Sequence, residues 1–156
     1  MKALELKNNT TGTHLKFNRK GNLLAVGQYD GNCKIFDTET KSEVRNLKKA
    51  KKEKPFEGHS ECISSVSWCK GGSKLLTSGY DCKVILWNLD EPKIEKSFLF
   101  NSAIILSQAN PRISNFCLVF PYSEVVCVIN LKTEEKFNLP ITRREPLVRL
   151  RMFKKF

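Results

Sequence analysis

The sequence predicts an all-β protein built from repeated four-stranded antiparallel sheets. Residues 21–37 recur at residues 72–88 after 51 positions, and no segment through residue 140 has the periodicity of an amphipathic helix. With 156 residues, 40% of them hydrophobic and 28% charged, the chain has the size and composition of one globular domain. Its longest apolar runs, 116–120 and 125–129, are too short for a membrane span of about 20 residues.

Each copy of the repeat predicts a β-hairpin. The two copies align without a gap, and each has two apolar stretches on either side of a Tyr-Asp pair, Tyr29-Asp30 and Tyr80-Asp81. Asp tolerates the unusual backbone angles of tight turns, so these pairs are expected to be the hairpin turns. A further strand is expected upstream of each hairpin, at residues 15–17 and 63–68.

A third, degenerate unit follows the two clear copies. It has the composition and spacing of four strands, which we expect at residues 103–106, 116–120, 125–130 and 136–139.

Two motifs resemble the signature of a WD40 blade. Gly58-His59 stands where such blades carry Gly-His, and Trp87-Asn88 stands where they carry Trp-Asp. WD40 repeats run for about 40–45 residues and stack as four-stranded sheets around an axis. The longer period of this chain is explained by a lysine-rich insertion before Pro55.

The resemblance implies an incomplete WD40-type β-propeller at residues 1–140. We expect about three four-stranded blades plus an N-terminal strand near residues 4–6, and a basic tail after residue 140. The expected blades cover residues 12–47, 58–98 and 103–139, with a basic loop at 48–55 and the tail at 141–156.

The resemblance also implies a buried structural tetrad in the second blade. His59, Ser78, Asp81 and Trp87 stand where WD40 blades place a chain of hydrogen bonds that satisfies the indole and the imidazole together. The first copy lacks this set, because Gly27 replaces the serine and Phe36 has no N–H group. Packing is therefore expected to hold the first blade.

A closer resemblance is to the retinoblastoma-binding protein five family, which supplies the WD40 subunit of COMPASS-type histone methyltransferase complexes. It extends over residues 1 to about 140 and fades after Pro140, where the family continues into a fourth blade. The chain is therefore expected to be C-terminally truncated relative to that family. The segments that carry the resemblance are 17–27, Val66-Ser67-Trp68 with Trp87, 96–100 and Asn110-Pro111-Arg112.

The net charge of +11 comes mainly from two short segments. Lys48, Lys49, Lys51, Lys52 and Lys54 form a cluster that reads as a nuclear-import signal, as a contact to DNA phosphates, or as a solvated loop. The tail from residue 141 has the pattern of either a strand or a basic amphipathic helix, or has no selected role. No recognition helix is apparent, so base-specific readout is not expected.

Catalysis, cofactors and metals are not expected. The sequence has no nucleophile beside a base and no glycine-rich phosphate loop, and His59 is expected to be a structural residue. The six cysteines are spread without a CxxC pair, which predicts reduced thiols. The nearest approach to a zinc site, His59 with Cys62 and Cys69, lacks a fourth ligand nearby.

The sequence is therefore interpreted as a non-enzymatic WD40 scaffold in the nucleus, docking to protein subunits of a histone methyltransferase complex. Contact with the backbone of nucleosomal DNA is a further possibility, whereas a membrane or a small-molecule substrate is not expected. Two alternatives stay open: a generic WD40 adaptor in another nuclear assembly, such as one for ribosome biogenesis or messenger-RNA processing, and a basic nucleic-acid-binding module.

Overall fold

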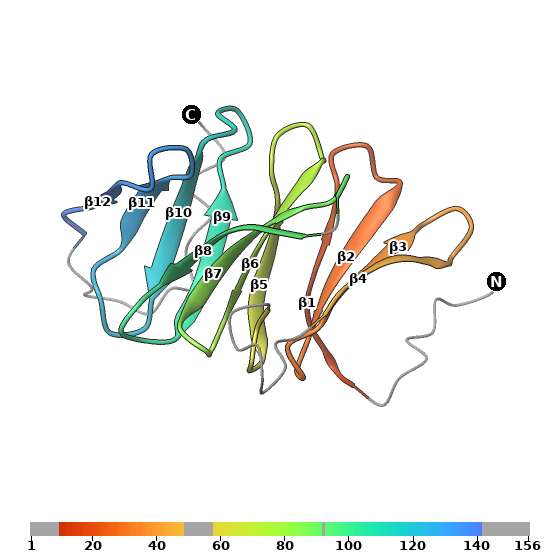
Figure 1. Ribbon diagram of the computed structural model, residues 1–156, viewed down its shortest axis with the longest axis horizontal. Coiled ribbons are helices and arrows are strands. Elements are labelled where there is room, and N and C mark those ends of the chain that lie inside the picture. Colours follow the sequence, from red (N-terminus) through yellow and green to blue (C-terminus); the bar gives the residue numbers. More distant parts are fainter. Residues whose placement is uncertain (1–9, 49–57, 92, 142–156) are drawn as a thin grey trace.

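The computed structural model describes residues 10–48, 58–91 and 93–141, which form twelve β-strands and no helix (Figure 1). The strands are β1 (Gly12–Phe17), β2 (Leu23–Gln28), β3 (Cys33–Asp37), β4 (Glu43–Leu47), β5 (Ile63–Trp68), β6 (Lys74–Gly79), β7 (Lys83–Asn88), β8 (Lys93–Leu99), β9 (Ile104–Ala109), β10 (Phe116–Pro121), β11 (Cys127–Asn130) and β12 (Lys136–Asn138).

The strands form three separate four-stranded sheets, each an antiparallel meander in chain order. The sheets stand side by side like blades, with the first strands β1, β5 and β9 in contact from one blade to the next (Figure 1). Because every blade runs in the same sense, the turns between first and second strands share one edge of the molecule. The turns between second and third strands share the opposite edge.

The turn from the third to the fourth strand begins in the same way in every blade. The side-chain oxygens of Asp37, Asn88 and Asn130 each accept two backbone N–H groups from residues two and three positions later. A short acceptor side chain at this position closes the chain into a turn. The side chain of Asn88, the last residue of β7, therefore bonds to the turn that follows the strand.

The hydrophobic core lies between the blades, in two layers. Side chains of β2 and β3, including Ala25 and Ile35, pack against Leu75 and Ile85 of the middle blade. The opposite face of the middle blade packs against the third blade. The middle blade is therefore covered on both faces, whereas each outer blade is covered by a neighbour on one face only.

Polar contacts also join the blades. The indole N–H of Trp68 donates to the carbonyl oxygen of Lys16 at 2.8 Å, and the backbone N–H of Val66 donates to Nδ1 of His14 at 3.2 Å. On the other side, the hydroxyls of Ser65 and Ser67 accept backbone N–H groups of β9 at 2.8 and 3.0 Å. These bonds fix the spacing of the first strands of the three blades, β1, β5 and β9.

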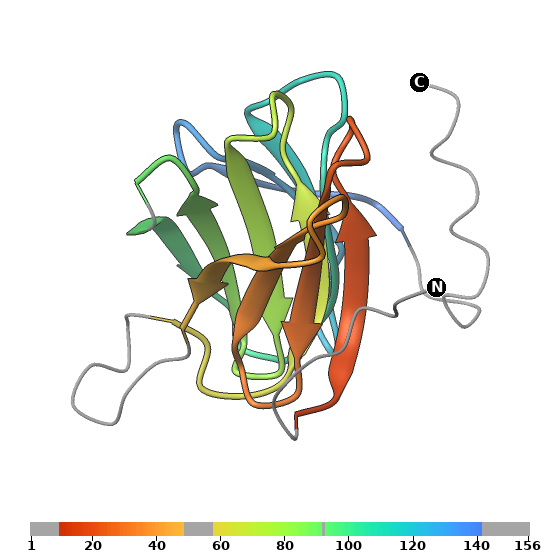
Figure 2. The same ribbon diagram turned by 90° about the vertical axis from the view of Figure 1, so that its right-hand side faces the viewer.

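The outward face of the first blade is turned toward the viewer in Figure 2. This face and that of the third blade retain exposed apolar side chains. Leu15 is 62% exposed and Phe17 54% exposed, and Phe137 of the third blade is 50% exposed. The N-terminal strand expected near residues 4–6 and the basic tail at 142–156 lie outside the described residues. No helix of the described residues is long and apolar enough to cross a membrane.

Candidate functional site

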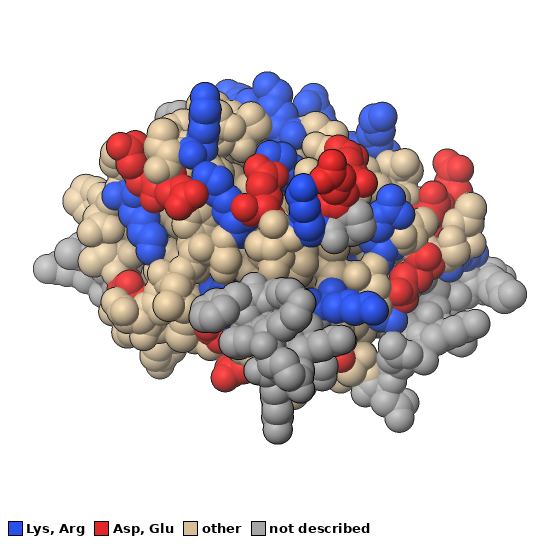
Figure 3. All heavy atoms as spheres, in the orientation of Figure 1, with Lys and Arg blue, Asp and Glu red and all other residues tan. Residues whose placement is uncertain are grey.

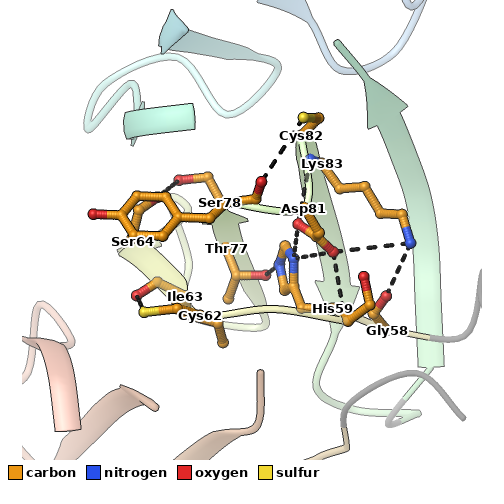
Figure 4. A network of polar contacts seen from close by, with 12 residues as sticks. Gly58, His59, Cys62, Ile63, Ser64, Thr77, Ser78, Asp81, Cys82 and Lys83 are labelled. Carbon is orange, nitrogen blue, oxygen red and sulfur yellow. Dashed lines mark hydrogen bonds and ion pairs between the residues drawn. The ribbon is translucent and has the colours of Figure 1, made fainter. Parts of the chain in front are cut away.

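A chain of buried hydrogen bonds runs through the middle blade from Trp87 to Asp81. The indole N–H of Trp87 donates to Oγ1 of Thr77 at 2.8 Å, and Oγ1 of Thr77 lies 2.8 Å from Nε2 of His59. Nδ1 of His59 lies 2.9 Å from Oδ1 of Asp81 (Figure 4). His59 and Thr77 are both fully buried.

The donors and acceptors of this chain assign its protons. The hydroxyl of Thr77 accepts from the indole, which can only donate, and uses its own hydrogen to donate to Nε2 of His59. Nδ1 then carries the imidazole hydrogen and donates to the carboxylate of Asp81. Each of these polar groups has a partner while the imidazole is neutral.

Asp81 anchors the end of this chain and also ties together two loops. Its Oδ2 accepts the backbone N–H of Ser60 at 3.0 Å, and Nζ of Lys83 lies 3.8 Å away. Burial acts to raise the pKa of Asp81, but the hydrogen bond from His59, the backbone N–H of Ser60 and the charge of Lys83 outweigh it and hold the pKa below its usual value. Asp81 is therefore a carboxylate in the folded protein.

The structure corrects one residue of the expected tetrad. His59, Asp81 and Trp87 are brought together, but Thr77 joins the indole to the imidazole where Ser78 was expected. The hydroxyl of Ser78 instead lies 2.7 Å from that of Ser65 and 3.1 Å from that of Ser64.

The pairing of β6 with β7 explains this correction. Trp87 lies opposite Leu75, and side chains on a strand alternate between faces, so Thr77 shares the face of Trp87 and Ser78 takes the other face. This register could have been worked out from the sequence by folding the hairpin about Asp81.

The first blade fills the same positions without polar groups. Val26 and Phe36 occupy the places of Thr77 and Trp87 in the repeat, and among the described residues Asp30 accepts hydrogen bonds only from Asn32 in its own turn. Gly27 occupies the place of Ser78. A Cβ atom there would lie 2.5 Å from Cγ2 of Ile63, so the absence of a side chain allows the two blades to approach closely.

The expected lysine cluster is mostly outside the described residues. Lys48 is described and exposed, at the residue after β4, whereas Lys49, Lys51, Lys52 and Lys54 are not described. Their role stays a prediction.

The cysteines are all free, and burial raises the pKa of Cys33 and of Cys117 to about 12. Among the described residues, no three His, Cys, Asp or Glu side chains are grouped as a metal site would require.

A hollow of about 160 Å³ lies between the second and third blades, lined in part by Lys74, Lys96 and Lys132. Ligand pockets usually measure about 300–1,000 Å³, so this hollow is small.

The buried chain is suited to holding the blade together rather than to chemistry. Both imidazole nitrogens have partners, and the side chains of His59 and Asp81 are 0% and 3% exposed, so neither can meet a dissolved substrate. The chain thereby fixes the turn at Asp81, which lies at the edge of the molecule where Tyr80 is exposed.

Comparisons with known proteins agree with this architecture. Residues 2–71 match the model of the anaphase-promoting complex subunit 4 WD40 domain. The chain is 36% identical over 128 residues to "Retinoblastoma-binding-like protein E" of Dictyostelium discoideum, which covers 80% of this chain and 23% of the relative. It is 33% identical over 105 residues to the "Retinoblastoma-binding protein 5 homolog" of Drosophila melanogaster, 67% of this chain and 20% of the relative.

A solved structure gives the same result. The β-propeller domain of Myceliophteria thermophila Cps50 (Swd1) superposes with a TM-score of 0.75 at 29% identity, over 87% of this chain and 43% of that domain. The chain spans about a fifth of the length of the curated relatives named above. It belongs to the WD40-repeat β-propeller proteins, and its sequence relatives include retinoblastoma-binding protein 5 homologues.

Proposed function

We propose that this chain is a non-enzymatic scaffold that docks to protein subunits of a nuclear histone methyltransferase complex. The observation that carries the proposal is its similarity to retinoblastoma-binding protein 5 homologues, which extends over up to 80% of the chain. The resemblance implies that this family supplies the WD40 subunit of such complexes. WD40 propellers are in general scaffolds without catalytic activity, which supports a scaffold role for this chain.

The geometry of the blades supports a scaffold role. Their strands are joined by short turns, and the backbone of each turn is tied by hydrogen bonds to a neighbouring strand or to a side chain within the turn. Rigid sheets that present loops at two edges offer surfaces for several partners without further rearrangement.

The positive charge supports a nuclear location with a secondary contact to DNA. Lys48 is exposed at the start of the lysine cluster, and backbone phosphates are the partners that such a cluster attracts without regard to base sequence. This contact is proposed as an addition to docking on protein, because the described residues contain no helix that could enter a DNA groove.

The test is capture of methyltransferase subunits on the immobilised chain. The tagged polypeptide is incubated with recombinant subunits of the complex prepared without their own retinoblastoma-binding protein 5 homologue, and retained subunits are identified by mass spectrometry. A matched variant carries Gln in place of Lys48, Lys49, Lys51, Lys52 and Lys54. Retention by both proteins, undiminished by salt, supports docking on protein.

Other outcomes favour the alternatives. Protein–DNA binding through six to ten phosphates weakens by about 10³ to 10⁵ between about 50 and 200 mM salt. If capture follows that steep decline and is lost in the Gln variant, the basic nucleic-acid-binding module is the better description. If methyltransferase subunits are not retained at any salt concentration, whereas a parallel incubation with nuclear extract retains another nuclear assembly, the generic adaptor is the better description.

A further inference from the structure

Each junction between neighbouring blades joins two different faces. The first strand of one blade packs on the sheet of the blade before it: β5 contacts β1 and β2, and β9 contacts β5, β6 and β7. The side that meets the preceding blade is the leading face of a blade, and the side that meets the following blade is its trailing face. Among the described residues, no blade packs on the leading face of the first blade or on the trailing face of the third, which lie at opposite ends of the molecule (Figure 1).

The trailing faces of the first and middle blades are built from the same positions of the repeat. Four buried side chains of the first blade recur 51 residues later in the middle blade, and each set belongs to the core layer shared with the next blade. A trailing face is therefore apolar where another blade covers it. These positions are Ala25, Cys33, Ile35 and Leu47, repeated as Leu76, Val84, Leu86 and Phe98.

The trailing face of the third blade is apolar as well. Leu118 lies opposite Val128, and Val128 lies opposite Phe137. The neighbouring Cys117 and Ile129 belong to the core layer shared with the middle blade, so alternation along the strands turns the other three side chains to the opposite face. Phe137 is 50% exposed, and Leu118 and Val128 are half-buried. We call these three side chains the open trailing face.

The residue in the place of Phe137 reaches across to the next blade in both other blades. Arg45 and Lys96 occupy this place in the pairing of the third and fourth strands. Nε of Arg45 donates to the carbonyl oxygen of Leu89 at 3.5 Å, and Nζ of Lys96 donates to that of Lys132 at 3.0 Å. Phe137 therefore stands where a contact to a following blade is made, with a ring in place of a cation.

The leading face of the first blade exposes the first strand, β1. Leu15 and Phe17 stand 51 residues before Val66 and Trp68. In the middle blade, Val66 is 2% exposed within the core layer shared with the first blade, and Trp68 packs against that layer. Leu15 and Phe17 are instead 62% and 54% exposed. We call these two side chains the open leading face.

The charge nearest to these apolar side chains is paired within the chain. Lys34 stands 51 residues before Ile85, which faces the first blade in the core. Nζ of Lys34 lies 2.8 Å from Oε2 of Glu43, and the side chain of Lys34 is 7% exposed. In Figure 3, charged side chains gather along the upper edge, and the surface over the third blade below that edge is mostly uncharged. Neither open face therefore requires a charged partner.

We propose that two copies of this chain close into a ring, in which the open trailing face of each copy packs on the open leading face of the other. Propellers typically close with about four to eight blades. The described residues of one copy form three blades, so two copies give six, which falls within this range, whereas three copies would exceed it. The inference concerns how copies of the chain associate, and it does not depend on the methyltransferase complex.

A second copy fits because the chain supplies both halves of the junction. The open trailing face has the apolar character that β5 and β9 cover in the two existing junctions, and β1 exposes apolar side chains at the positions of β5 that make such a contact. A head-to-tail junction closes into a ring when its rotation returns to the first copy, and otherwise it extends into filaments. A ring buries both open faces of every copy, whereas a filament leaves one exposed at each end.

The test is sedimentation equilibrium and native mass spectrometry of the full chain. About 0.3 M salt screens the repulsion between copies that each carry +11. The variants are Leu15→Lys/Phe17→Lys on the leading face and Phe137→Glu on the trailing face, all at exposed positions. The matched control, Leu99→Glu/Ile113→Glu, changes side chains that are 66% and 53% exposed and lie outside both open faces. Circular dichroism checks that each variant retains its sheets.

The unmodified chain is expected to have twice the mass of one copy, with no larger species. Each variant alters both junctions of the ring, so its dissociation constant is expected to rise by at least about 50-fold, while the control stays within about threefold. Mixing the two variants restores one junction between unchanged faces and places Lys opposite Glu in the other, so a dimer with one copy of each is expected.

Several results would overturn the proposal. They are a monomer at every concentration, an open series of larger species, and a control that weakens association as much as the variants. Loss of the dimer in the leading-face variant alone would show that two first blades pack on each other instead. A mixture of the two variants that stays monomeric would exclude head-to-tail closure.

Discussion

Replacing Thr77 by Val tests the hydrogen-bonded chain at its central member. Valine has nearly the same shape, and Val26 already occupies the equivalent position in the first blade. The substitution removes the partner of two groups, the indole N–H of Trp87 and Nε2 of His59, each 2.8 Å from the hydroxyl. A buried polar group left without a partner costs about 1–3 kcal/mol, so the two together predict a loss of about 2–4 kcal/mol in the free energy of unfolding.

The assay is urea unfolding followed by far-ultraviolet circular dichroism, applied as a double-mutant cycle with Trp87→Phe. The double variant gives the middle blade the Val and Phe that the first blade carries at Val26 and Phe36. Since the indole donor is then absent, Thr77→Val is expected to cost about 1–2 kcal/mol less in the Trp87→Phe background.

Ser78→Ala is the matched control, because it removes the neighbouring hydroxyl on the other face. Ser65 keeps its bond from the N–H of Ser107, so the control is expected to cost about 1 kcal/mol. Equal losses for Ser78→Ala and Thr77→Val, or additive effects of Thr77→Val and Trp87→Phe, would refute the assigned connectivity.

Four further predictions follow from the same contacts. Asp81→Ala is expected to cost about 1–3 kcal/mol, and more than Asp30→Ala, because Asp81 supports His59 whereas Asp30 bonds only within its own turn; equal thermal shifts would contradict this. Burial, and then the charge of Lys16, lower the pKa of His14 below its usual 6.5, so the unfolded chain binds a proton more readily than the folded chain does. The stabilisation that is present above pH 6.5 is therefore lost as the pH falls below 6.5. His14→Gln should flatten this dependence in unfolding curves between about pH 7.5 and 5.5. Thiol labelling of the native protein should modify Cys62 and Cys82, and labelling of the fully buried cysteines should require unfolding; rapid native labelling of all six would be inconsistent with the core. Finally, the outward apolar faces predict that the isolated polypeptide associates or aggregates, and a monodisperse monomer with a cooperative melt in analytical ultracentrifugation and calorimetry would show that three blades suffice.

The blades could be predicted because their signals are local. Alternation of apolar residues, turn residues at a fixed offset and a gap-free repeat all depend on neighbours within one hairpin, and the structure has sheets where these signals fall. The third blade lacks both signature motifs, and its strand composition and spacing predict it.

Contacts between blades could not be predicted in the same way. The bond from the N–H of Val66 to His14 joins residues 52 positions apart, and neither has a motif that identifies the other. The expectation that Ser78 joins the indole to the imidazole is wrong for a related reason. The resemblance implies a hydroxyl near this position, but the face of the strand decides which of two adjacent hydroxyls meets the indole.

The middle blade differs from its neighbours in how much of the structure depends on it. Both core layers include its side chains, and its inner strand β5 supplies polar contacts to β1 on one side and to β9 on the other. It is also the blade that contains the fully satisfied hydrogen-bond chain, while the equivalent positions of the first blade are apolar. Buried polar networks of this kind fix one arrangement because any displacement leaves several groups unpaired at once. The sequence therefore places its most specific interactions in the blade against which both others pack.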